Sequence, residues 1–323
     1  MDSLEIKLLN MLKLGKSMYD INKELGISTT EIYKLLFDIK NKYKMFEDII
    51  FNNGIQYTNF YNLFGNSNTY LNMEPHNNRI RLMLVSDLHL GNHNDSVKAI
   101  NLMYDYVIAN KINVILNLGD FFEGATKNKT CKFDDCHEQI SYALEKYPSD
   151  KSVTNFLLLG NHDISLMLDK KIDIKKIVEE RRKDIVITGI GRSNLFLNDF
   201  RFRLDHETNR YPVEPSSSFN NGIILKGHSH KYKVISSYSS MSISLPSLSD
   251  VLTNQYSCYF PSLIDMTLHF KNSMINNITL MNYIVLYDEL MLMNEQRITV
   301  EIEKNSIFLD KEQEKKKQKI INI

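Results

Sequence analysis

Four short polar clusters each follow an apolar run, and their side chains are of the kinds that bind metal ions. The first, Asp87-Leu-His89, ends an apolar run that begins at Met83. A carboxylate and an imidazole two residues apart, at the carboxyl end of a buried strand, can converge on one ion. The other clusters follow in order: Gly119-Asp120, Gly160-Asn161-His162-Asp163 and Gly227-His228-Ser229-His230. Together the four clusters predict a metal site assembled from the ends of several strands.

With one further histidine, these clusters offer seven oxygen or nitrogen donors and no thiolate: Asp87, His89, Asp120, Asn161, His206, His228 and His230. Seven donors are too many for one ion and suit two ions that share a carboxylate. Oxygen and imidazole donors favour Mn, Fe, Zn, Co or Ni, and the set is too rich in nitrogen for Ca or Mg alone. Two ions about 3.5–4 Å apart generate hydroxide near neutral pH and take up charge on a phosphoryl group. The donor set therefore predicts phosphoester hydrolysis.

The order and spacing of these motifs resemble the calcineurin-like metallophosphoesterase superfamily, from about Arg79 to Ile235 and onward to the strands near residue 300. The resemblance implies an α/β fold, a two-sheet metallophosphoesterase sandwich flanked by helices. It also implies two divalent metal ions, with Mn expected first and Fe, Zn, Co or Ni as alternatives. Carried over by motif, it assigns Asp87, His89 and His230 to one ion, Asn161, His206 and His228 to the other, and Asp120 to the bridge.

The same resemblance gives catalytic roles to two residues that are not ligands. His162 is expected to protonate the leaving oxygen or to stabilise the charged transition state while a metal-bridging hydroxide attacks. Glu123 lies three positions after the bridging aspartate, where some members carry an acidic residue that orients this histidine. Gly160 and Gly227 are expected to let the backbone turn sharply before the ligands that follow them.

The elements that must position these residues alternate between strand and helix. We expect strands at 80–85, 113–118 and 156–159, and helices at 96–109 and near 137–147. This order indicates an α/β layered architecture. After Asp184 the sequence changes to short strand-like runs, which are 185–188, 195–197, 200–204, 222–225, 232–235, 263–270 and 278–285. A second sheet packed on the first is the simplest way to bury them.

A different pattern precedes this region. Residues 1–46 read as three helices, and Gly26-Ile27-Ser28-Thr29 between the second and third resembles the turn of a bacterial helix-turn-helix protein. An Asn-Gly hairpin signal at Phe51 to Tyr57 is compatible with the wing of a winged variant. The expected organisation is a helix-turn-helix-like domain at 1–61, a linker at 62–78, a metallophosphoesterase domain at 79–310 and a charged tail at 311–323.

Charge leaves the partner of the first domain open. Lys+Arg and Asp+Glu both number 39 in the whole chain, and the basic residues within 1–50 are matched by as many acidic ones. Phosphate contacts dominate DNA affinity, so binding needs segregated charge, which Lys34, Lys40, Lys42 and Lys44 supply on the third helix. Residues 1–61 are therefore expected either to contact DNA or RNA or to form a bundle for dimerisation or docking.

Other composition features bear on the compartment. The three cysteines form no CxxC pair, which favours a reducing compartment. The chain start lacks a signal-peptide pattern, and no apolar run approaches the ~20 residues of a membrane span. We expect a cytoplasmic protein without a membrane partner.

The motifs narrow the substrate only slightly. Gly119-Asp-Phe-Phe-Glu-Gly124 lacks the Asp-Arg-Gly ending of protein serine/threonine phosphatases, and Asn161-His162 differs from the Asn-Arg of lipid-A-pathway diphosphatases. Both motifs look closer to the nuclease and phosphodiesterase branches. The leading hypothesis is a two-metal phosphodiesterase or nuclease acting on nucleic acid. The alternatives are a small-molecule nucleotide phosphatase or phosphodiesterase, and a DNA-binding regulator with a phosphoesterase sensor domain.

Overall fold

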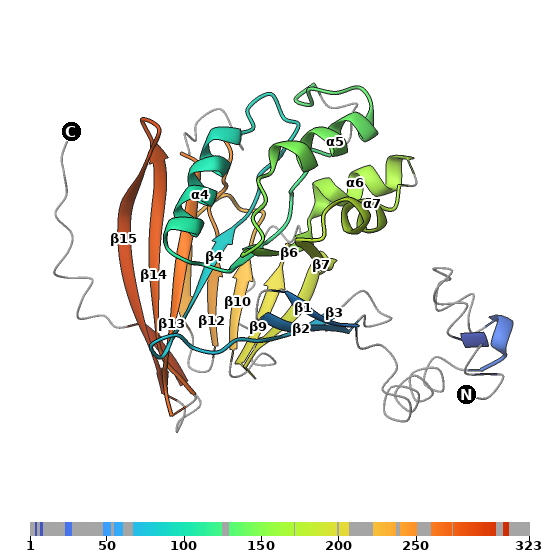
Figure 1. The fold of residues 1–323 in the computed structure, drawn as a ribbon. Coiled ribbons are helices and arrows are strands. Elements are labelled where there is room, and N and C mark those ends of the chain that lie inside the picture. The colour runs from blue at the N-terminus through green and yellow to red at the C-terminus, as the bar shows by residue number, and fades with distance from the viewer. Residues whose placement is uncertain are drawn as a thin grey trace.

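The structure is a computed structural model. It describes residues 4, 7–8, 23–27, 48–52, 55–60, 67–124, 129–170, 172–198, 200–206, 222–236, 240–250, 260–272, 274–301 and 306–309. Within this part of the chain the strands form two mixed layers, and the helices α4 to α7 cover the outer face of one of them (Figure 1).

The first layer carries a parallel centre with an antiparallel extension. Its strands are, in spatial order, β7 (Ile185–Ile190), β6 (Thr154–Leu159), β5 (Val114–Asn117), β4 (Arg79–Val85), β13 (Ser262–Lys271), β14 (Met274–Leu286), β15 (Glu289–Glu301) and β16 (Ser306–Leu309). Strands β4 to β7 are parallel to one another, so their carboxyl ends meet at one edge. Strands β13 to β16 continue the layer antiparallel from β4.

The second layer is linked to the first at a tight corner. Its strands are β8 (Arg192–Leu197), β9 (Phe200–Asp205), β10 (Gly222–Lys226), β12 (Ser240–Ser244) and β11 (Lys233–Ser236). The corner is a single pairing of Ile190 with Arg192, between β7 and β8. At the other end β16 lies beside β11 and β12, so the two layers face each other along their length. Strands β9 and β10 are parallel and end at a common edge.

Alternating side chains of the first layer build two separate cores. Leu82 and Leu84 of β4 point into the core between the layers, whereas Met83 and Val85 point toward the helices. Strands β5 and β6 repeat the pattern, and this two-residue period is what a strand buried on both faces requires. Each fully buried Leu or Met contributes about 1.5–3 kcal/mol, so both faces of β4 help to hold the strand that leads into Asp87.

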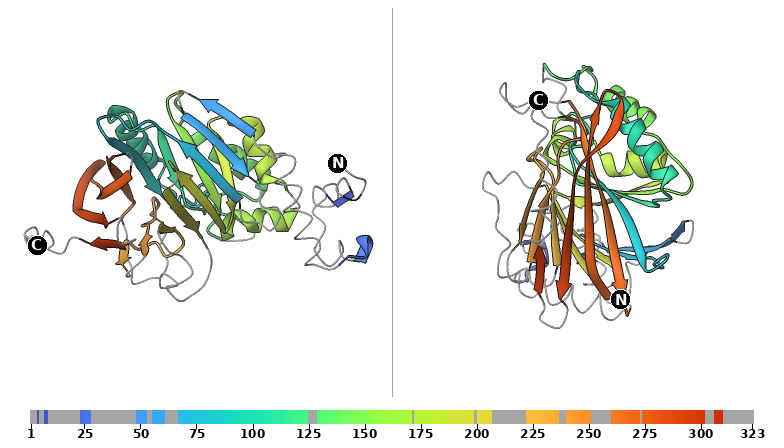
Figure 2. Two further views of the ribbon diagram at one scale, coloured as in Figure 1. Left: turned by 90° about the horizontal axis from the view of Figure 1, so that it is seen from below. Right: turned by 90° about the vertical axis from the view of Figure 1, so that its left-hand side faces the viewer.

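The helices pack on the outer face of the first layer through one apolar stripe each. They are α4 (Val97–Ala109), α5 (Cys136–Lys146), α6 (Asn161–Lys170) and α7 (Ile174–Arg181). Figure 2 shows them together on one side of the strands. The Asp135 side chain caps α5 by accepting from the backbone N–H of His137 at 2.7 Å, and Asp173 caps α7 through Lys176 at 3.0 Å. No helix in the described part of the chain is long and apolar enough to cross a membrane.

Most elements expected from the sequence are present. The strands and helices predicted between residues 80 and 159 are all confirmed, and each short run expected after Asp184 lies in a strand. Helices α6 and α7 and strand β12 were not expected, whereas β15 and β16 agree with the strands that the resemblance implied near residue 300. Helix α6 begins inside the Gly-Asn-His-Asp motif, for which no helix or strand was predicted. Tertiary packing decides these elements, because their local patterns are short.

The predicted linker at 62–78 is wrong for part of its length. Residues Ser67–Asn72 form β3, which pairs in parallel with β8 and antiparallel with β2 (Ile55–Phe60). Leu71 of β3 is fully buried in the core between the layers. The Asn-rich composition concealed this strand, which is held by backbone pairing on both sides and by the buried side chains of Thr69 and Leu71.

The amino-terminal prediction lies almost entirely outside the described residues. Gly26 has a φ of +66°, as the expected turn requires. Of the helices expected before it only residues 4, 7–8 and 23–25 are described, and the helix expected after it lies outside the described residues. The expected hairpin is present as β1 (Asp48–Asn52) paired with β2. Through β3 this hairpin is continuous with the second layer. Its use as a wing stays a prediction.

Candidate metal centre

All seven predicted ligands follow strands whose carboxyl ends lie on one side of the layers. Asp87 and His89 follow β4, Asp120 follows β5, and Asn161 begins α6 directly after β6. From the second layer, His206 follows β9, and the last two histidines follow β10. Because β4 to β6 are parallel to one another, their carboxyl ends lie at one edge of the first layer. The carboxyl ends of β9 and β10, which are also parallel, lie at the corresponding edge of the second layer.

Five of these ligands have a left-handed backbone, which only glycine adopts without strain. The φ angles are +55° at Asp87, +47° at His89, +51° at Asp120, +69° at His228 and +56° at His230. Asp and His tolerate this region better than most residues, yet each instance costs about 1–3 kcal/mol unless the surroundings enforce it. Strain repeated at five predicted ligands marks this edge as a functional site.

One group of donor atoms is formed by Asp87, His89 and His230. Their ligand atoms all lie within 4.8 Å of one another. His230 Nε2 is 3.2 Å from Asp87 Oδ1 and 3.4 Å from His89 Nε2. The three side chains are 0%, 2% and 6% exposed, so water does not separate them. The structure thus brings together the residues that were expected to share the first ion.

A second group is formed by Asp120, His206 and His228, again within 4.8 Å. His206 Nε2 lies 3.0 Å from Asp120 Oδ2, and the rings of His206 and His228 meet edge to face with centroids 5.4 Å apart. Asn161 begins α6 next to this group, and its Oδ1 is buried without a hydrogen bond. These are the residues expected at the second ion.

Asp120 joins the two groups. Its Oδ2 faces His206, while its Oδ1 accepts a hydrogen bond of 2.8 Å from the backbone N–H of His162 in the first turn of α6. A helix N-terminus stabilises a carboxylate there. Asp120 also belongs to a third cluster of donor atoms with His89 and His162. A carboxylate between both groups has the position that a bridging ligand needs.

Hydrogen-bond partners of two histidines, His206 and His89, determine which of their ring nitrogens is free to bind a metal ion. Nδ1 of His206 donates to the carbonyl of Leu118, and Nδ1 of His89 donates to Glu123 Oε2 at 3.2 Å. Because a carbonyl or carboxylate only accepts here, the proton of each neutral ring sits on Nδ1. Nε2 of both rings therefore keeps its lone pair for a metal ion.

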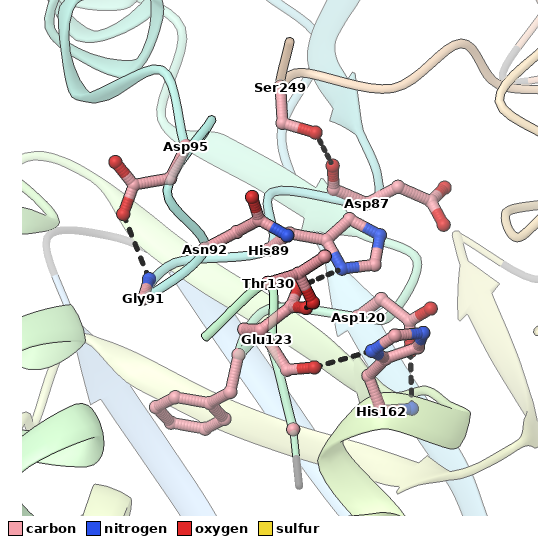
Figure 3. Close-up of polar contacts among 12 residues, drawn as sticks. Asp87, His89, Gly91, Asn92, Asp95, Asp120, Glu123, Thr130, His162 and Ser249 are labelled. Atoms are coloured by element: carbon pink, nitrogen blue, oxygen red, sulfur yellow. Dashed lines mark hydrogen bonds and ion pairs between the residues drawn. The ribbon is translucent and has the colours of Figure 1, made fainter. Parts of the chain in front are cut away.

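The role of Glu123 differs from the expectation. Its carboxylate contacts His89 and accepts from the hydroxyl of Thr130, and it does not contact the ring of His162. His162 is held instead by the backbone carbonyl of Glu123, to which its Nδ1 donates. Figure 3 shows Glu123 beside the two rings, with one dashed line to each of them. One residue thus orients both a predicted ligand and the predicted proton donor, through different atoms.

Gly160 and Gly227 are needed because a side chain at either position would collide with neighbouring atoms, and not because the backbone turns there. Neither has a positive φ. A Cβ at Gly160 would overlap Asp120 Oδ1, and a Cβ at Gly227 would overlap Ser86 Oγ and the ring of His206. These glycines let the ligand side chains approach the backbone closely, which corrects the expected reason for them.

Three supporting residues were not identified from the sequence. Asp163 accepts backbone N–H groups from Gly160 at 2.7 Å and Phe122 at 2.8 Å, and so ties the loop of Asp120 to the start of α6. Ser247 and Ser249 both donate to the backbone carbonyl of Asp87, at 2.8 and 3.0 Å; Figure 3 shows the bond from Ser249. The sequence could have indicated Asp163, because it is the last residue of the Gly-Asn-His-Asp motif. Ser247 and Ser249 lie outside the four motifs, and no sequence pattern distinguishes them.

The charges at the centre shift the pKa of the groups that face one another. Burial raises the pKa of Asp87, but the imidazoles of His230 and His206 outweigh burial and bring it well below the ordinary value. Burial lowers the pKa of His206, yet Asp120 and Asp87 raise it to about 9. Burial and the charge of His206 lower the pKa of His228. In this arrangement the imidazoles take the place of cations beside the buried carboxylates.

The residues present fit metal ions. Asn161 Oδ1 is buried in the described part of the chain without a hydrogen-bond partner, whereas Asp87 Oδ1 and His206 Nε2 face only ion-pair partners of the centre itself, His230 Nε2 and Asp120 Oδ2. A buried polar atom without a partner costs about 1–3 kcal/mol, so such atoms call for a ligand. Oxygen and imidazole donors are suited to divalent transition metals.

Comparison with known proteins agrees with this geometry. The family model of calcineurin-like phosphoesterases matches residues 80–292, which is more than half of the chain. The chain belongs to this family, whose members are divalent-metal-dependent phosphoesterases. No curated protein sequence matches the chain significantly.

Several solved structures are similar to the chain at low sequence identity and with TM-scores below 0.5. Vacuolar protein sorting 29 from Cryptosporidium parvum is 14% identical with a TM-score of 0.43, covering 68% of this chain and 98% of that one. An archaeal phosphodiesterase is 13% identical with a TM-score of 0.42, covering 64% and 99%. The phosphoesterase YfcE from E. coli is 14% identical with a TM-score of 0.40, covering 67% and 98%. At this level, similarity carries no argument about substrate.

Proposed function

We propose that this metal-dependent phosphoesterase is a two-metal phosphodiesterase that cleaves nucleic acid. The observation that supports two ions is that two separate donor groups lie side by side and are linked by a third cluster, in which Asp120 of the second group lies with His89 of the first. Asp87, His89 and His230 would hold one ion, and Asn161, His206 and His228 the other. Bound there, two divalent ions, Mn first among them, would neutralise phosphoryl charge and supply a nucleophile at neutral pH.

The chain's own residues contribute orientation and a proton. His162 donates through Nδ1 to the Glu123 carbonyl, so Nε2 is the atom that can exchange a proton with the substrate. When the ring is charged, it can give the Nε2 proton to the departing sugar oxygen and return to the neutral Nδ1–H form. A sugar alkoxide is a poor leaving group, so this step is useful on a nucleic-acid diester, in which the bond to a sugar oxygen breaks.

The polymeric substrate is proposed from the amino-terminal sequence pattern. The third expected helix carries a group of lysines on a segment that resembles a DNA-reading helix. The hairpin that follows that helix is continuous with the catalytic layers through β3, which offers a route for holding a long substrate near the centre.

A substrate panel tests the chemistry. Full-length protein with Mn is assayed on a monoester, an aryl diester, a dinucleotide, and single- and double-stranded oligonucleotides, with Asp87→Ala as the inactive control. We expect oligonucleotide cleavage that Asp87→Ala abolishes. Intact oligonucleotides beside rapid turnover of a small nucleotide ester would instead favour a small-molecule enzyme.

The contribution of the first domain is tested in the full chain, because deleting residues up to 75 would remove β3 from the sheet. The variant replaces four lysines of the third expected helix by glutamate, at Lys34, Lys40, Lys42 and Lys44. The matched control does the same in the tail, at Lys315, Lys316, Lys317 and Lys319. We expect only the first variant to raise KM for oligonucleotides, with the aryl diester unaffected. Equal effects of both variants would remove the case for an amino-terminal substrate contact.

A further inference from the structure

A buried amide on α5 holds the segment that carries Glu123. Gln139 is 0% exposed, and its side chain pairs with both backbone groups of Gly124. Its Oε1 accepts from the Gly124 N–H at 3.0 Å, and its Nε2 donates to the Gly124 carbonyl at 3.0 Å. Nε2 also lies 2.9 Å from Cys131 Sγ. The Gln139 amide thus makes the same two hydrogen bonds that a residue of a neighbouring strand would make, and it fixes the backbone of Gly124 in place.

The segment held in this way orients two histidines of the centre. Glu123 directly precedes Gly124, and its carboxylate receives Nδ1 of His89, whereas its carbonyl receives Nδ1 of His162. The two rings meet edge to face with centroids 4.6 Å apart. A shift of the Glu123 backbone would therefore move both hydrogen-bond acceptors together.

The packing around Gln139 leaves it little freedom. A Cβ added at Gly91 would come within 2.7 Å of Gln139 Cγ, so this side chain fills the space beside the loop that follows His89. Gly91 has a φ of +99° and Gly124 a φ of +101°. Gln139 therefore lies between the loops of the first and second motifs and contacts both.

We propose that Gln139 is a positioning residue that sets the orientation of His89 and His162 together, through Gly124 and Glu123. It would thereby couple the first metal group to the proton donor; the proton-donor part rests on the proposed function. Residues in the shell behind metal ligands typically change affinity or activity by about 10–100-fold.

Two diesters separate this role from a merely structural one. The variant Gln139→Leu keeps a buried side chain of similar length and removes both hydrogen bonds to Gly124. At saturating Mn we expect about ten-fold lower kcat on a dinucleotide, whose sugar oxygen needs a proton. The loss on an aryl diester should be smaller, because p-nitrophenolate leaves without one. KM for both substrates should stay within the range of the wild type.

A second readout needs neither metal nor turnover. Nitrogen NMR of labelled histidines in the metal-free protein reports which ring nitrogen carries the proton. In the wild type we expect His89 and His162 to be held as Nδ1–H. In Gln139→Leu both signals should move toward the average of the two tautomers, while His206, held by the Leu118 carbonyl, stays unchanged.

Two further variants keep the test decisive. Asn155→Leu removes another buried amide, which bonds to Tyr104 and Tyr147 behind the same layer and does not contact the centre. It controls for loss of stability alone. Gln139→Glu retains the acceptor for the Gly124 N–H and loses the donor to the Gly124 carbonyl. This variant replaces Gln139→Leu in both measurements if the leucine variant does not fold.

Each outcome decides the proposal. Equal loss on both diesters in Gln139→Leu, as in Asn155→Leu, with unchanged histidine tautomers, would overturn it. If the wild type cleaves the aryl diester but no nucleotide substrate, the proposed function fails, and the tautomers alone then decide the role of Gln139. Unequal loss on the two diesters together with shifted tautomers supports positioning.

Discussion

The two halves of the metal centre are held by different kinds of partner. In the half of Asp87, His89 and His230, side chains do the holding: the Glu123 carboxylate orients His89, and two serine hydroxyls hold the Asp87 backbone. In the half of Asn161, His206 and His228, the backbone orients His206 through the Leu118 carbonyl, and one side chain, Asp163, fixes the start of α6. The first half therefore depends mainly on the identity of a few side chains, whereas in the second half the orientation of His206 depends on the path of the strands.

The two halves also differ in solvent exposure and in the charge of their histidines. The first three residues are nearly inaccessible, whereas Asn161 and His228 are partly exposed. The second half also combines a histidine of raised pKa with one of lowered pKa, because His206 faces two carboxylates and its charge then opposes that of His228. We expect the ion of the second half to exchange faster and to respond more strongly to pH.

The largest effect is expected from removing the residue that the halves share. Asp120→Asn should lower kcat by at least about 10³-fold, since metal stabilisation is worth several kcal/mol and each 1.4 kcal/mol is a factor of ten. Metal content by elemental analysis should fall for both ions. Asp105→Asn, at an exposed position of α4, is the control. Loss of one ion only would show that Asp120 serves a single half.

The second-largest effect is expected from pH, because protonation of His206 should weaken metal binding in the second half. The pKa of His206, raised to about 9 by Asp120 and Asp87 against the effect of burial, makes this ring a cation at pH 7 in the metal-free protein. A charged imidazole binds no metal, so affinity of the second half should rise with pH, about ten-fold per unit, until about pH 9. Calorimetry at pH 7 in buffers of different ionisation enthalpy should show protons released on binding. Release of no protons would contradict the prediction.

Changing Glu123 should affect the first half alone. Glu123→Gln removes the charge behind His89 and retains the carbonyl that holds His162, so affinity for the first ion should fall by about ten-fold. A competition titration with a chelator measures both affinities. Glu145→Gln on α5, whose side chain is 75% exposed, controls for charge. An equal fall at both ions would mean that the halves are coupled more tightly than their contacts indicate.

The smallest effects are expected at the serines. Ser247→Ala and Ser249→Ala should each reduce the free energy of unfolding by about 1 kcal/mol, because each loses one hydrogen bond to the Asp87 carbonyl. Since the remaining hydroxyl still donates in each single variant, the double variant should lose more than the sum. Chemical denaturation measures this. Strict additivity would show that the two hydroxyls do not substitute for each other.

The candidate ligands could be found from the sequence because local rules place them. Asp87, Asp120 and Asn161 follow short apolar runs, and a run of that kind predicts a buried strand whose end is a site. The structure brings these residues together at one edge. The partners of the ligands could not be found in this way. Gln139 lies in the middle of an amphipathic helix and gives no periodic signal that distinguishes it from any other buried position.

Two departures from the sequence-based expectations have a common cause. The expected linker contains β3, and Glu123, which was expected to orient His162, does so through its backbone carbonyl while its carboxylate holds His89. In both cases short-range composition or family analogy suggested one partner, and packing against a distant element supplied another. β3 pairs with β8 more than a hundred residues away, and Glu123 is placed by Gln139 of α5.

By itself, the sequence determined the donor atoms, their order along the chain and the strands that end in them, since apolar periodicity and residue chemistry are local properties. Only the tertiary structure decided which atom of Glu123 faces which histidine, why Gly160 and Gly227 must be glycine, and which ring nitrogens remain free. These depend on loops from separate strands meeting within hydrogen-bond distance, and no local pattern specifies such a distance.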